Sequence, residues 1–551
     1  MSISFSGLRR NELLHAMKEE VFDVLVIGGG ITGAGIALDA QTRGMSTALI
    51  EMQDYAAGTS SRSTKLVHGG LRYLKQFEVK MVAEVGKERA VVYENAAHVT
   101  TPEWMLLPFY KGGTFGAFST SIGLRVYDFL AGVKRGERRK MLTREETLRR
   151  EPLLKQDNLK GGGYYVEYRT DDARLTIEVM KKAVEAGVKA VNYTKANQFV
   201  YENGKAVGVE AVDTITGQTY TIRARHIVNA TGPWVDTLRE LDKSKNGKAL
   251  RLTKGVHLVF DGERFPLRQA IYFDTPDGRM VFAIPRDGKT YIGTTDTDYT
   301  ADIAYPTMTA EDRDYVLRAA NDIFPSLKLS ADDVESSWAG LRPLIYQEGK
   351  SPSEISRKDE IFHSPSGLLT IAGGKLTGYR KMGETVTNLI AGKLQQETGR
   401  SYPSSRTKTM ALSGGDFGGS AAFPEFVTQM TAEGVRLGLS TAVAQQLTTR
   451  YGTNVKAVYS RILQSEQAAS AYELPSYVYA SLMYAIEEEM VVKPVDFFVR
   501  RTGALFFDID WVHRWKEAVL RIMKELFHYS EDQMAVMTAD LDKQLHDAKH
   551  A

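Results

Sequence analysis

The sequence of 551 residues contains no cysteine. This absence excludes disulfide bonds, thiolate catalysis, and zinc or iron–sulfur centres with cysteine ligands. No metal site is expected. A strong excess of one charge is also missing, because 70 Lys and Arg residues nearly balance 68 Asp and Glu residues. The net charge of +2 provides no general positive field to attract nucleic acid, so no nucleic-acid partner is expected.

Long hydrophobic runs are absent as well. Residues 1–20 carry charges throughout, unlike the apolar core of a signal peptide. Residues 24–38 lack charge, but this stretch is too short and too rich in glycine to span a bilayer. The composition, 43% hydrophobic and 25% charged, is typical of a folded globular protein, and the length favours two or three domains. We expect a cytoplasmic protein.

The strongest motif that is present lies at residues 22–54. A short apolar run over 22–27 is followed at once by Gly28-Gly29-Gly30-Ile31-Thr32-Gly33, which fits the pattern G-x-G-x-x-G. The sequence then predicts a helix over 31–43 and a second strand over 46–51. Strand, glycine turn, helix and strand in this order are typical of a dinucleotide-binding βαβ unit.

The glycines of this motif each have a physical role. Gly28 permits the tight turn, Gly30 lets the backbone approach a pyrophosphate, and Gly33 allows helix and strand to pack closely. The helix N-terminus offers free N–H groups to phosphates. Glu51, at the end of the second strand, can accept hydrogen bonds from ribose hydroxyls. An ordinary βαβ turn would not need three consecutive glycines, which lower stability unless the backbone shape requires them.

Three other segments have the composition of cofactor-binding loops. Residues 54–66 are rich in Ser and Thr, and their position beside Glu51 favours cofactor contact over a purely solvated loop. The sequence predicts separate strands over 219–224 and from 226. The second leads into a small-residue turn, and a strand over 368–372 leads into a glycine pair and a helix to about 393. The candidate cofactor-binding residues are Gly28, Gly30, Thr32, Gly33, Glu51, Thr59, Ser60, Ser61, Ser63, Lys65, His68, Gly69, Gly70, Ala230, Gly232, Gly374, Lys375, Leu376 and Thr377.

The remaining segments are less specific. Residues 104–130 are aromatic and apolar, and 125–150 contain nine Lys and Arg against four Asp and Glu. Together they could lie against an anionic membrane surface, or form a core-packing segment followed by a solvated basic helix. Residues 251–344 predict a mostly β unit, 401–420 a linker, and 421–551 a largely helical region that includes a helix over 441–451.

Three motifs together resemble the FAD-dependent glycerol-3-phosphate dehydrogenases, within the broader glutathione-reductase-type and amino-acid-oxidase-like flavoproteins. The first runs from Ile27 to Asp39 and continues to Arg43-Gly44. The second is TKLVHGGLRYL at residues 64–74, and the third is GGKLTGYR at residues 373–380. One departure is Gly383, where the family pattern has alanine. This difference concerns helix packing rather than chemistry.

The resemblance implies an α/β fold with three parts. A FAD-binding Rossmann-like (glutathione-reductase-type) domain is expected over roughly 20–100, 160–235 and 345–395. A substrate domain with a mixed β-sheet is expected over roughly 100–160 and 236–345, interleaved with the first. An α-helical C-terminal domain over 421–551 follows the linker at 401–420.

The resemblance also implies a reaction. sn-Glycerol 3-phosphate would be oxidised to dihydroxyacetone phosphate, with hydride transfer from C2 to flavin N5 and electrons passed to the quinone pool at the membrane surface. FAD is expected to be bound noncovalently, because there is no cysteine to link it, although His68 could link it in principle. Two alternatives share the fold, namely an oxidase that uses O2 and an amino-acid or sarcosine oxidase. Peripheral contact with the inner face of the cell membrane and a homodimer also stay open.

The residues that match the family's substrate site are mainly cationic. Arg72, Tyr73, Arg357 and Lys375 match positions that hold the phosphate group, for which Arg is suited by its bidentate geometry. His257 and Arg342 match positions near C2. His257 is the more plausible proton acceptor, while Arg342 would stabilise developing negative charge. The alternatives are a strand histidine satisfied by backbone and an arginine in a salt bridge.

Overall fold

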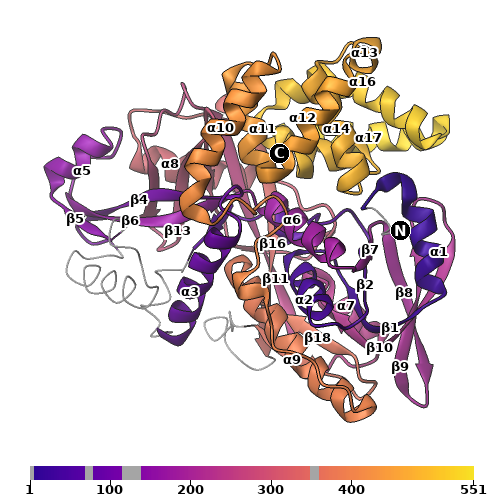
Figure 1. Cartoon of the computed structure of the whole chain (residues 1–551). Coiled ribbons are helices and arrows are strands. Elements are labelled where there is room, and N and C mark those ends of the chain that lie inside the picture. The colour runs from indigo at the N-terminus through magenta and orange to yellow at the C-terminus, as the bar shows by residue number, and fades with distance from the viewer. Residues whose placement is uncertain (1–4, 69–78, 114–137, 348–358) are drawn as a thin grey trace.

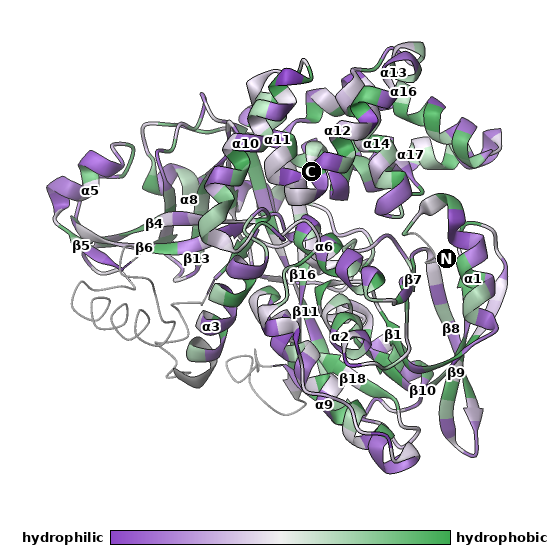
Figure 2. Ribbon diagram, in the orientation of Figure 1, coloured by the Kyte–Doolittle hydropathy of each residue, from purple (hydrophilic) through white to green (hydrophobic). Residues whose placement is uncertain are grey.

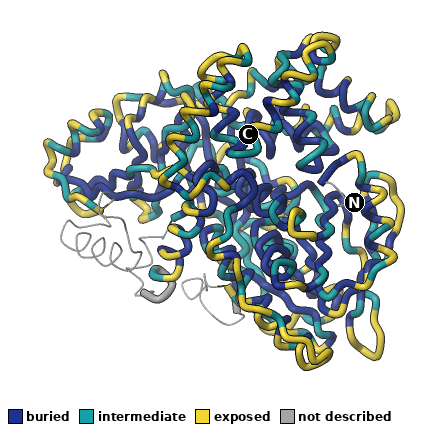
Figure 3. The backbone as a smooth tube through the Cα atoms, viewed as in Figure 1, coloured by how far each residue is buried: buried dark blue, intermediate teal, exposed yellow. Residues whose placement is uncertain are grey.

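The computed structural model describes residues 5–68, 79–113, 138–347 and 359–551. Two β-sheets form the centre of the molecule, and helices of the C-terminal region pack along one side (Figure 1). Buried residues follow the strands, whereas exposed residues lie mainly on outer helices and hairpin tips (Figure 3). We call the eight-stranded sheet the nucleotide sheet and the ten-stranded sheet the second sheet.

The nucleotide sheet is built around β1 (Val21–Ile27). Its strand order is β17-β18-β10-β1-β2-β7. In addition, β9 pairs with β10, and β8 pairs with β9. The bounds are β2 (Thr47–Ile50), β7 (Lys189–Val191), β8 (Thr194–Glu202), β9 (Lys205–Asp213), β10 (Thr219–Asn229), β17 (Glu360–His363) and β18 (Leu369–Ala372). β1 runs parallel to both β2 and β10. Parallel strands are covered on both faces, which explains their continuous apolar sequences and the green colour of β18 in Figure 2.

One prediction about this sheet is wrong. The sequence predicts separate strands over 219–224 and from 226 onward, but β10 is a single strand. Its first half pairs antiparallel with β9, and its second half pairs parallel with β1. The alternation of exposed arginines Arg223 and Arg225 with buried neighbours fits a strand with one solvated face, so the charges do not end the strand.

The crossover helix α2 (Ile31–Thr42) is buried along nearly its whole length. It packs against α6 (Asp172–Glu185) and α9 (Tyr379–Thr398), which explains why its sequence has no polar stripe. The contact with α9 explains the departure from the family pattern at Gly383. A Cβ atom at Gly383 would lie 2.8 Å from the backbone of Gly35. Glycine therefore lets the two helices approach closely at this point.

The two longest strands of the second sheet, β11 and β16, pair with each other at one end of the sheet, and β11 also pairs with β14 and β15. Its bounds are β3 (Leu66–Val67), β4 (Thr100–Tyr110), β5 (Lys140–Leu142), β6 (Leu159–Thr170), β11 (Lys248–Asp261), β12 (Ala270–Asp274), β13 (Met280–Arg286), β14 (Lys289–Gly293), β15 (Thr297–Asp298) and β16 (Val334–Gln347). Residues 160–170 are expected in the FAD-binding portion from the sequence, whereas β6, which contains them, pairs with β4 in this sheet. The helix α8 (Ala310–Ile323) covers one side of its core.

The remaining helices surround these sheets. Their bounds are α1 (Arg10–Lys18), α3 (Val79–Asn95), α5 (Arg144–Arg150), α7 (Val235–Leu241), α10 (Phe423–Arg436), α11 (Thr441–Tyr451), α12 (Val455–Gln464), α13 (Glu466–Ala471), α14 (Ser476–Glu488), α15 (Ala504–Phe507), α16 (Ile509–Phe527) and α17 (Glu531–Lys549), with a π-helix at Asp496–Arg501. We call 421–551 the C-terminal unit. None of the helices in the described ranges combines the length and the apolar character that a bilayer crossing requires.

The connection over 401–420 is packed onto the body of the protein. Leu412 and Ser413 are buried, and the Asn95 side chain at the end of α3 donates hydrogen bonds to the backbone oxygens of Thr407 and Lys408. The segment is therefore held in place, although its Gly and Pro content predicts a loop.

Buried charges fasten the C-terminal unit to the nucleotide-binding region. Asp54, three residues after Glu51, accepts hydrogen bonds from Arg501 at 2.7 and 2.9 Å and from Arg500 at 2.5 Å. All three side chains are at most 5% exposed. A second cluster joins Arg174 of α6 to Glu489 of the C-terminal unit. Such pairs hold their geometry because an unpaired buried charge is costly.

Candidate functional site

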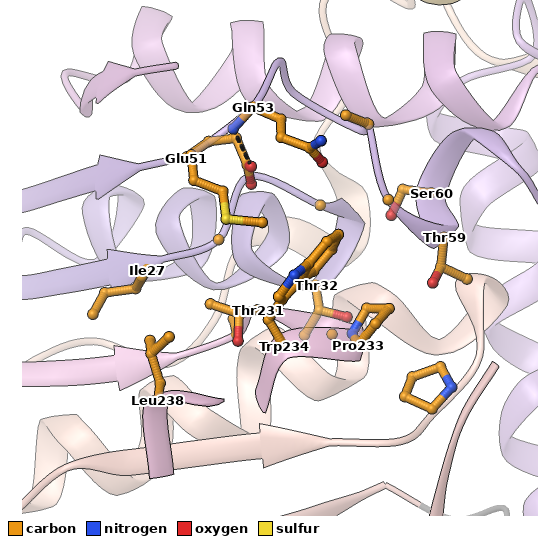
Figure 4. Close-up of a pocket in the computed structure, with 18 of the residues that line it drawn as sticks. Ile27, Thr32, Glu51, Gln53, Thr59, Ser60, Thr231, Pro233, Trp234 and Leu238 are labelled. Carbon is orange, nitrogen blue, oxygen red and sulfur yellow. Dashed lines mark hydrogen bonds between the residues drawn. The ribbon is translucent and has the colours of Figure 1, made fainter. Parts of the chain in front are cut away.

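A cavity of about 690 Å³ opens where β1, β2 and β10 end (Figure 4). Ligands of open parallel sheets bind at the carboxyl ends of the strands. The wall includes the predicted glycine motif, Glu51, and residues of the loops that follow β2, β10 and β18. The side chains of Glu51, Thr59, Ser60 and Trp234 surround this space in Figure 4.

The glycine turn has the shape that a pyrophosphate site requires. Gly28 has a positive φ of 115°, which L side chains rarely adopt. A Cβ atom on Gly33 would lie 1.9 Å from the carbonyl oxygen of Gly28, so only glycine fits between helix and turn. Gly28 and Gly30 line the cavity directly. The first turn of α2 therefore presents backbone to the cavity with no side chain in the way.

The acid after β2 is held in a fixed orientation. One oxygen of Glu51 accepts a hydrogen bond from Gly29 N at 2.6 Å, and the other accepts from Gln53 N at 2.8 Å (Figure 4). Burial raises the pKa of Glu51, and the two backbone hydrogen bonds oppose that effect. Each carboxylate oxygen keeps further acceptor capacity, which suits it to ribose hydroxyls.

Some residues of the loop 59–65 line the cavity, and others hold the loop in place. Thr59, Ser60 and Ser63 line the cavity. Lys65 does not line it. Its ammonium is buried and bonds to Asp172 at 2.7 Å and to the backbone oxygen of Ser61 at 3.0 Å. Lys65 thus supports the loop, and the Ser61 hydroxyl is buried with no hydrogen-bond partner in the described part of the chain.

The other predicted cofactor residues fall into three groups. Thr32, Ala230, Gly232, Gly374, Lys375 and Leu376 line the cavity. His68 and Thr377 lie outside its wall and bond to each other, the hydroxyl of Thr377 contacting both backbone groups of His68. Burial lowers the pKa of His68 to about 3 and keeps the ring neutral. Gly69, Gly70, Arg72, Tyr73 and Arg357 lie outside the described residues.

The two predicted catalytic residues lie on one face of the second sheet. In the β11–β16 ladder His257 lies opposite Trp338, and Arg342 lies opposite Thr253. His257 is 2% exposed, and Nε2 is 3.1 Å from Thr64 Oγ1. Burial, and then the charges of Arg342 and Lys65, lower the pKa of His257 well below its usual value. The imidazole is therefore neutral at physiological pH.

Arg342 combines a salt bridge with partial exposure. It donates to Asp296 Oδ1 and to the backbone oxygen of Thr295, each at 3.1 Å, and to Thr294 Oγ1 at 3.2 Å. Its side chain is 36% exposed. Neither Arg342 nor His257 is part of the cavity wall in Figure 4. The arginine is anchored at a fixed point while its guanidinium still faces solvent.

The structure adds residues that the sequence analysis did not select. Trp234 lines the cavity and sits 3.3 Å from the place a Cβ atom of Gly58 would take. Its position directly after the predicted turn at Gly232 was an available signal. Asp172 holds both Ser63 and Lys65, at 2.7 Å each. No local signal marks Asp172, because its partners lie more than 100 positions away in the sequence.

The parallel sheet, the glycine turn and the anchored acid define a dinucleotide-binding protein of the βαβ class. The family model described as FAD dependent oxidoreductase matches residues 23–380, and the one described as C-terminal domain of alpha-glycerophosphate oxidase matches residues 405–534.

Similar proteins match this chain over nearly its whole length. The aerobic glycerol-3-phosphate dehydrogenase of Bacillus subtilis is 63% identical over 548 residues, covering 100% of this chain and 99% of the relative. That of Staphylococcus epidermidis is 56% identical over 549 residues, covering 99% and 98%. The solved structure of the glycerol-3-phosphate dehydrogenase from Bacillus halodurans complexed with FAD has 52% identity and a TM-score of 0.86, covering 99% and 98%. The chain belongs to the family of FAD-dependent glycerol-3-phosphate dehydrogenases, as the sequence motifs predict, and its cofactor is FAD.

Proposed function

We propose that the protein oxidises sn-glycerol 3-phosphate to dihydroxyacetone phosphate and passes the electrons to a quinone. The observation that carries this proposal is the 63% identity to an aerobic glycerol-3-phosphate dehydrogenase over the entire chain. The site supports the proposal. Its glycine turn, its anchored Glu51 and its cavity of about 690 Å³ fit the pyrophosphate and ribose of a dinucleotide.

The proposed chemistry divides between the cofactor and the protein. Bound FAD supplies the hydride acceptor for the C2 hydrogen. His257 takes the proton of the C2 hydroxyl, which its neutral imidazole is able to do. Arg342 stays charged and stabilises negative charge that develops on the C2 oxygen.

The phosphate group of the substrate needs several fixed cations. We assign this role to Arg72, Tyr73, Arg357 and Lys375. Lys375 supports the assignment, since it lies in the cavity wall at the start of the turn Leu376–Gly378, where backbone N–H groups also favour an anion.

The matched test of the catalytic pair uses alanine variants. His257→Ala and Arg342→Ala should each lower turnover by roughly 10²-fold or more while FAD stays bound. Arg223→Ala and His226→Ala are the controls, because both residues belong to β10 of the nucleotide sheet, where Arg223 is paired with Glu202 and His226 with Glu397. Wild-type turnover in either catalytic variant removes that residue from the mechanism.

Oxygen is the second candidate acceptor. It is favoured by the match of residues 405–534 to a domain named for an alpha-glycerophosphate oxidase. The quinone is preferred because the relatives that match along the whole chain are named aerobic glycerol-3-phosphate dehydrogenases rather than oxidases. The two differ in one product: a quinone-linked enzyme reduces a short-chain quinone with little H2O2, whereas an oxidase yields one H2O2 per glycerol 3-phosphate.

The assembly and location complete the proposal. We place the protein at the inner face of the cell membrane as a peripheral enzyme, since it must meet a quinone there, and we expect a homodimer. Vesicle flotation and analytical ultracentrifugation test these two points separately.

A further inference from the structure

Three contacts fix the imidazole of His257 in space. Nε2 lies 3.1 Å from Thr64 Oγ1. One face of the ring is stacked on Trp338, with a centroid distance of 4.7 Å and an interplanar angle of 12°. At its edge lies Gly293, where an added Cβ atom would come within 2.4 Å of His257 Cδ2. The ring cannot turn without displacing one of these neighbours.

The two ring nitrogens differ in their surroundings. Nε2 has Thr64 as its partner, whereas Nδ1 is buried and has no hydrogen-bond partner among the residues that the structure describes. A buried histidine that served only the sheet would be expected to have both nitrogens bonded. An unbonded buried nitrogen is costly, so its presence on the sheet face that also carries Arg342 points to a chemical role.

The C-terminal unit holds the tryptophan in turn. Trp338 Nε1 donates to the backbone oxygen of Ser63 at 3.0 Å. The rings of Phe506 and Phe507, both in α15, lie 5.5 and 5.7 Å from the ring of Trp338. The Ser336 hydroxyl also donates to the backbone oxygen of Phe506. Helix α15 is thus packed directly behind the residue on which His257 is stacked.

We propose that Thr64 and Trp338 are positioning residues that hold the imidazole of His257 in place, and that α15 holds Trp338 in place. In this arrangement Nε2–H donates to Thr64 Oγ1, and the lone pair of Nδ1 is the proton acceptor. This inference rests on the proposed function. It also gives the C-terminal unit a part in catalysis, because the side chains of α15 help to set the plane of the imidazole.

The proton balance follows from this geometry. The C2 hydroxyl proton would move to Nδ1, and bound FAD would supply the acceptor for the C2 hydride. The imidazolium that forms carries N–H on both nitrogens and keeps its Nε2–H···Oγ1 bond to Thr64. Thr64 therefore stabilises the charged ring relative to a variant without an acceptor.

Thr64→Val removes the acceptor and keeps the shape of the side chain. We expect kcat to fall about tenfold, the value of one lost hydrogen bond to a charged group, with little change in KM or bound FAD. The acid limb of the kcat/KM profile should move to lower pH, since the imidazolium is less stable without Thr64. Thr64→Ser should restore kcat to within about threefold. Wild-type kcat in Thr64→Val would overturn the proposal.

A second measurement does not depend on the substrate. In holoenzyme labelled with 15N-histidine, and with His257→Gln for assignment, NMR should show His257 as the neutral Nε2–H tautomer. The opposite tautomer would overturn the assigned roles even if turnover were normal. Failure of the wild type to oxidise glycerol 3-phosphate, with the tautomer as expected, would instead refute the proposed function and leave the geometry intact.

The role of α15 in holding Trp338 is tested by Phe507→Ala, with Phe527→Ala as the matched control. Phe527 belongs to the same unit but stacks on Tyr529, away from Trp338. Phe507→Ala should lower kcat roughly threefold without changing KM, the size expected for one aromatic contact. Phe527→Ala should leave kcat unchanged. Equal kcat in the two variants would contradict a role for α15.

Discussion

Replacing Asp54 by asparagine removes a buried charge at the joint between the nucleotide sheet and the C-terminal unit. The carboxylate is fully buried and meets two guanidiniums, Arg501 and Arg500, with a further hydrogen bond from Asn192 at 3.1 Å. Asn keeps the shape of Asp54 but presents an N–H donor to one of the arginines. Arg500 still has Asp496 as a partner, whereas Arg501 keeps mainly the backbone oxygen of Glu489.

The loss of stability in Asp54→Asn follows from two quantities. Burial alone would raise the pKa of Asp54, but Arg501 and Arg500 outweigh it and lower the pKa from 3.8 to about 2. That shift corresponds to about 2 kcal/mol of stability. Removing one partner of a buried ion pair typically costs about 3–5 kcal/mol. We therefore expect Asp54→Asn to lower the free energy of unfolding by about 3 kcal/mol.

Urea unfolding of the holoenzyme at neutral pH, followed by circular dichroism, measures this loss. The control is Asp261→Asn, whose carboxylate is 44% exposed and pairs with Lys289, and which should change stability by less than about 0.5 kcal/mol. Because the folded pKa is depressed, the contribution is complete above pH 3.8 and is lost as pH falls from there to about 2. A loss below about 1 kcal/mol at neutral pH would refute the buried-network reasoning.

Three further predictions concern the cofactor site. Gly33→Ala should yield protein without FAD, because the new methyl would lie 1.9 Å from the oxygen of Gly28; a normal flavin spectrum would contradict the close packing. Glu51→Ala should weaken FAD binding by roughly tenfold to a hundredfold in a dialysis titration, since it removes the ribose acceptor and leaves Gly29 N unpaired; unchanged affinity would rule out the contact. Lys375→Met should raise KM for glycerol 3-phosphate more than it lowers kcat in steady-state assays, and the reverse pattern would place Lys375 in the chemistry instead.

Features that depend on local sequence were predictable. The strand, glycine turn and helix around Gly28 follow from an apolar run and a fixed spacing, and all three are present in the structure. The helix over 441–451 was predicted with the bounds that α11 has, because a Ser at its N-cap and a glycine at its end mark both limits.

Features that depend on distant partners were not predictable. Lys65 has the positive charge of a phosphate ligand, but its ammonium is paired with Asp172, 107 positions away in the sequence. The stacking of His257 on Trp338 arises from the pairing of β11 with β16, which no local pattern fixes. The family resemblance predicts catalytic roles for His257 and Arg342, whereas the contacts that orient the two side chains depend on the sheet register.

The central claim, that glycerol 3-phosphate reduces the bound flavin, is tested most directly by mixing the two under anaerobic conditions. The visible flavin absorbance should bleach with glycerol 3-phosphate and stay unchanged with glycerol or glycine. Bleaching by the phosphate ester alone is the predicted result, and it holds whichever acceptor later takes the electrons. A yellow protein that does not bleach, or that bleaches equally with glycerol or with glycine, would contradict the account.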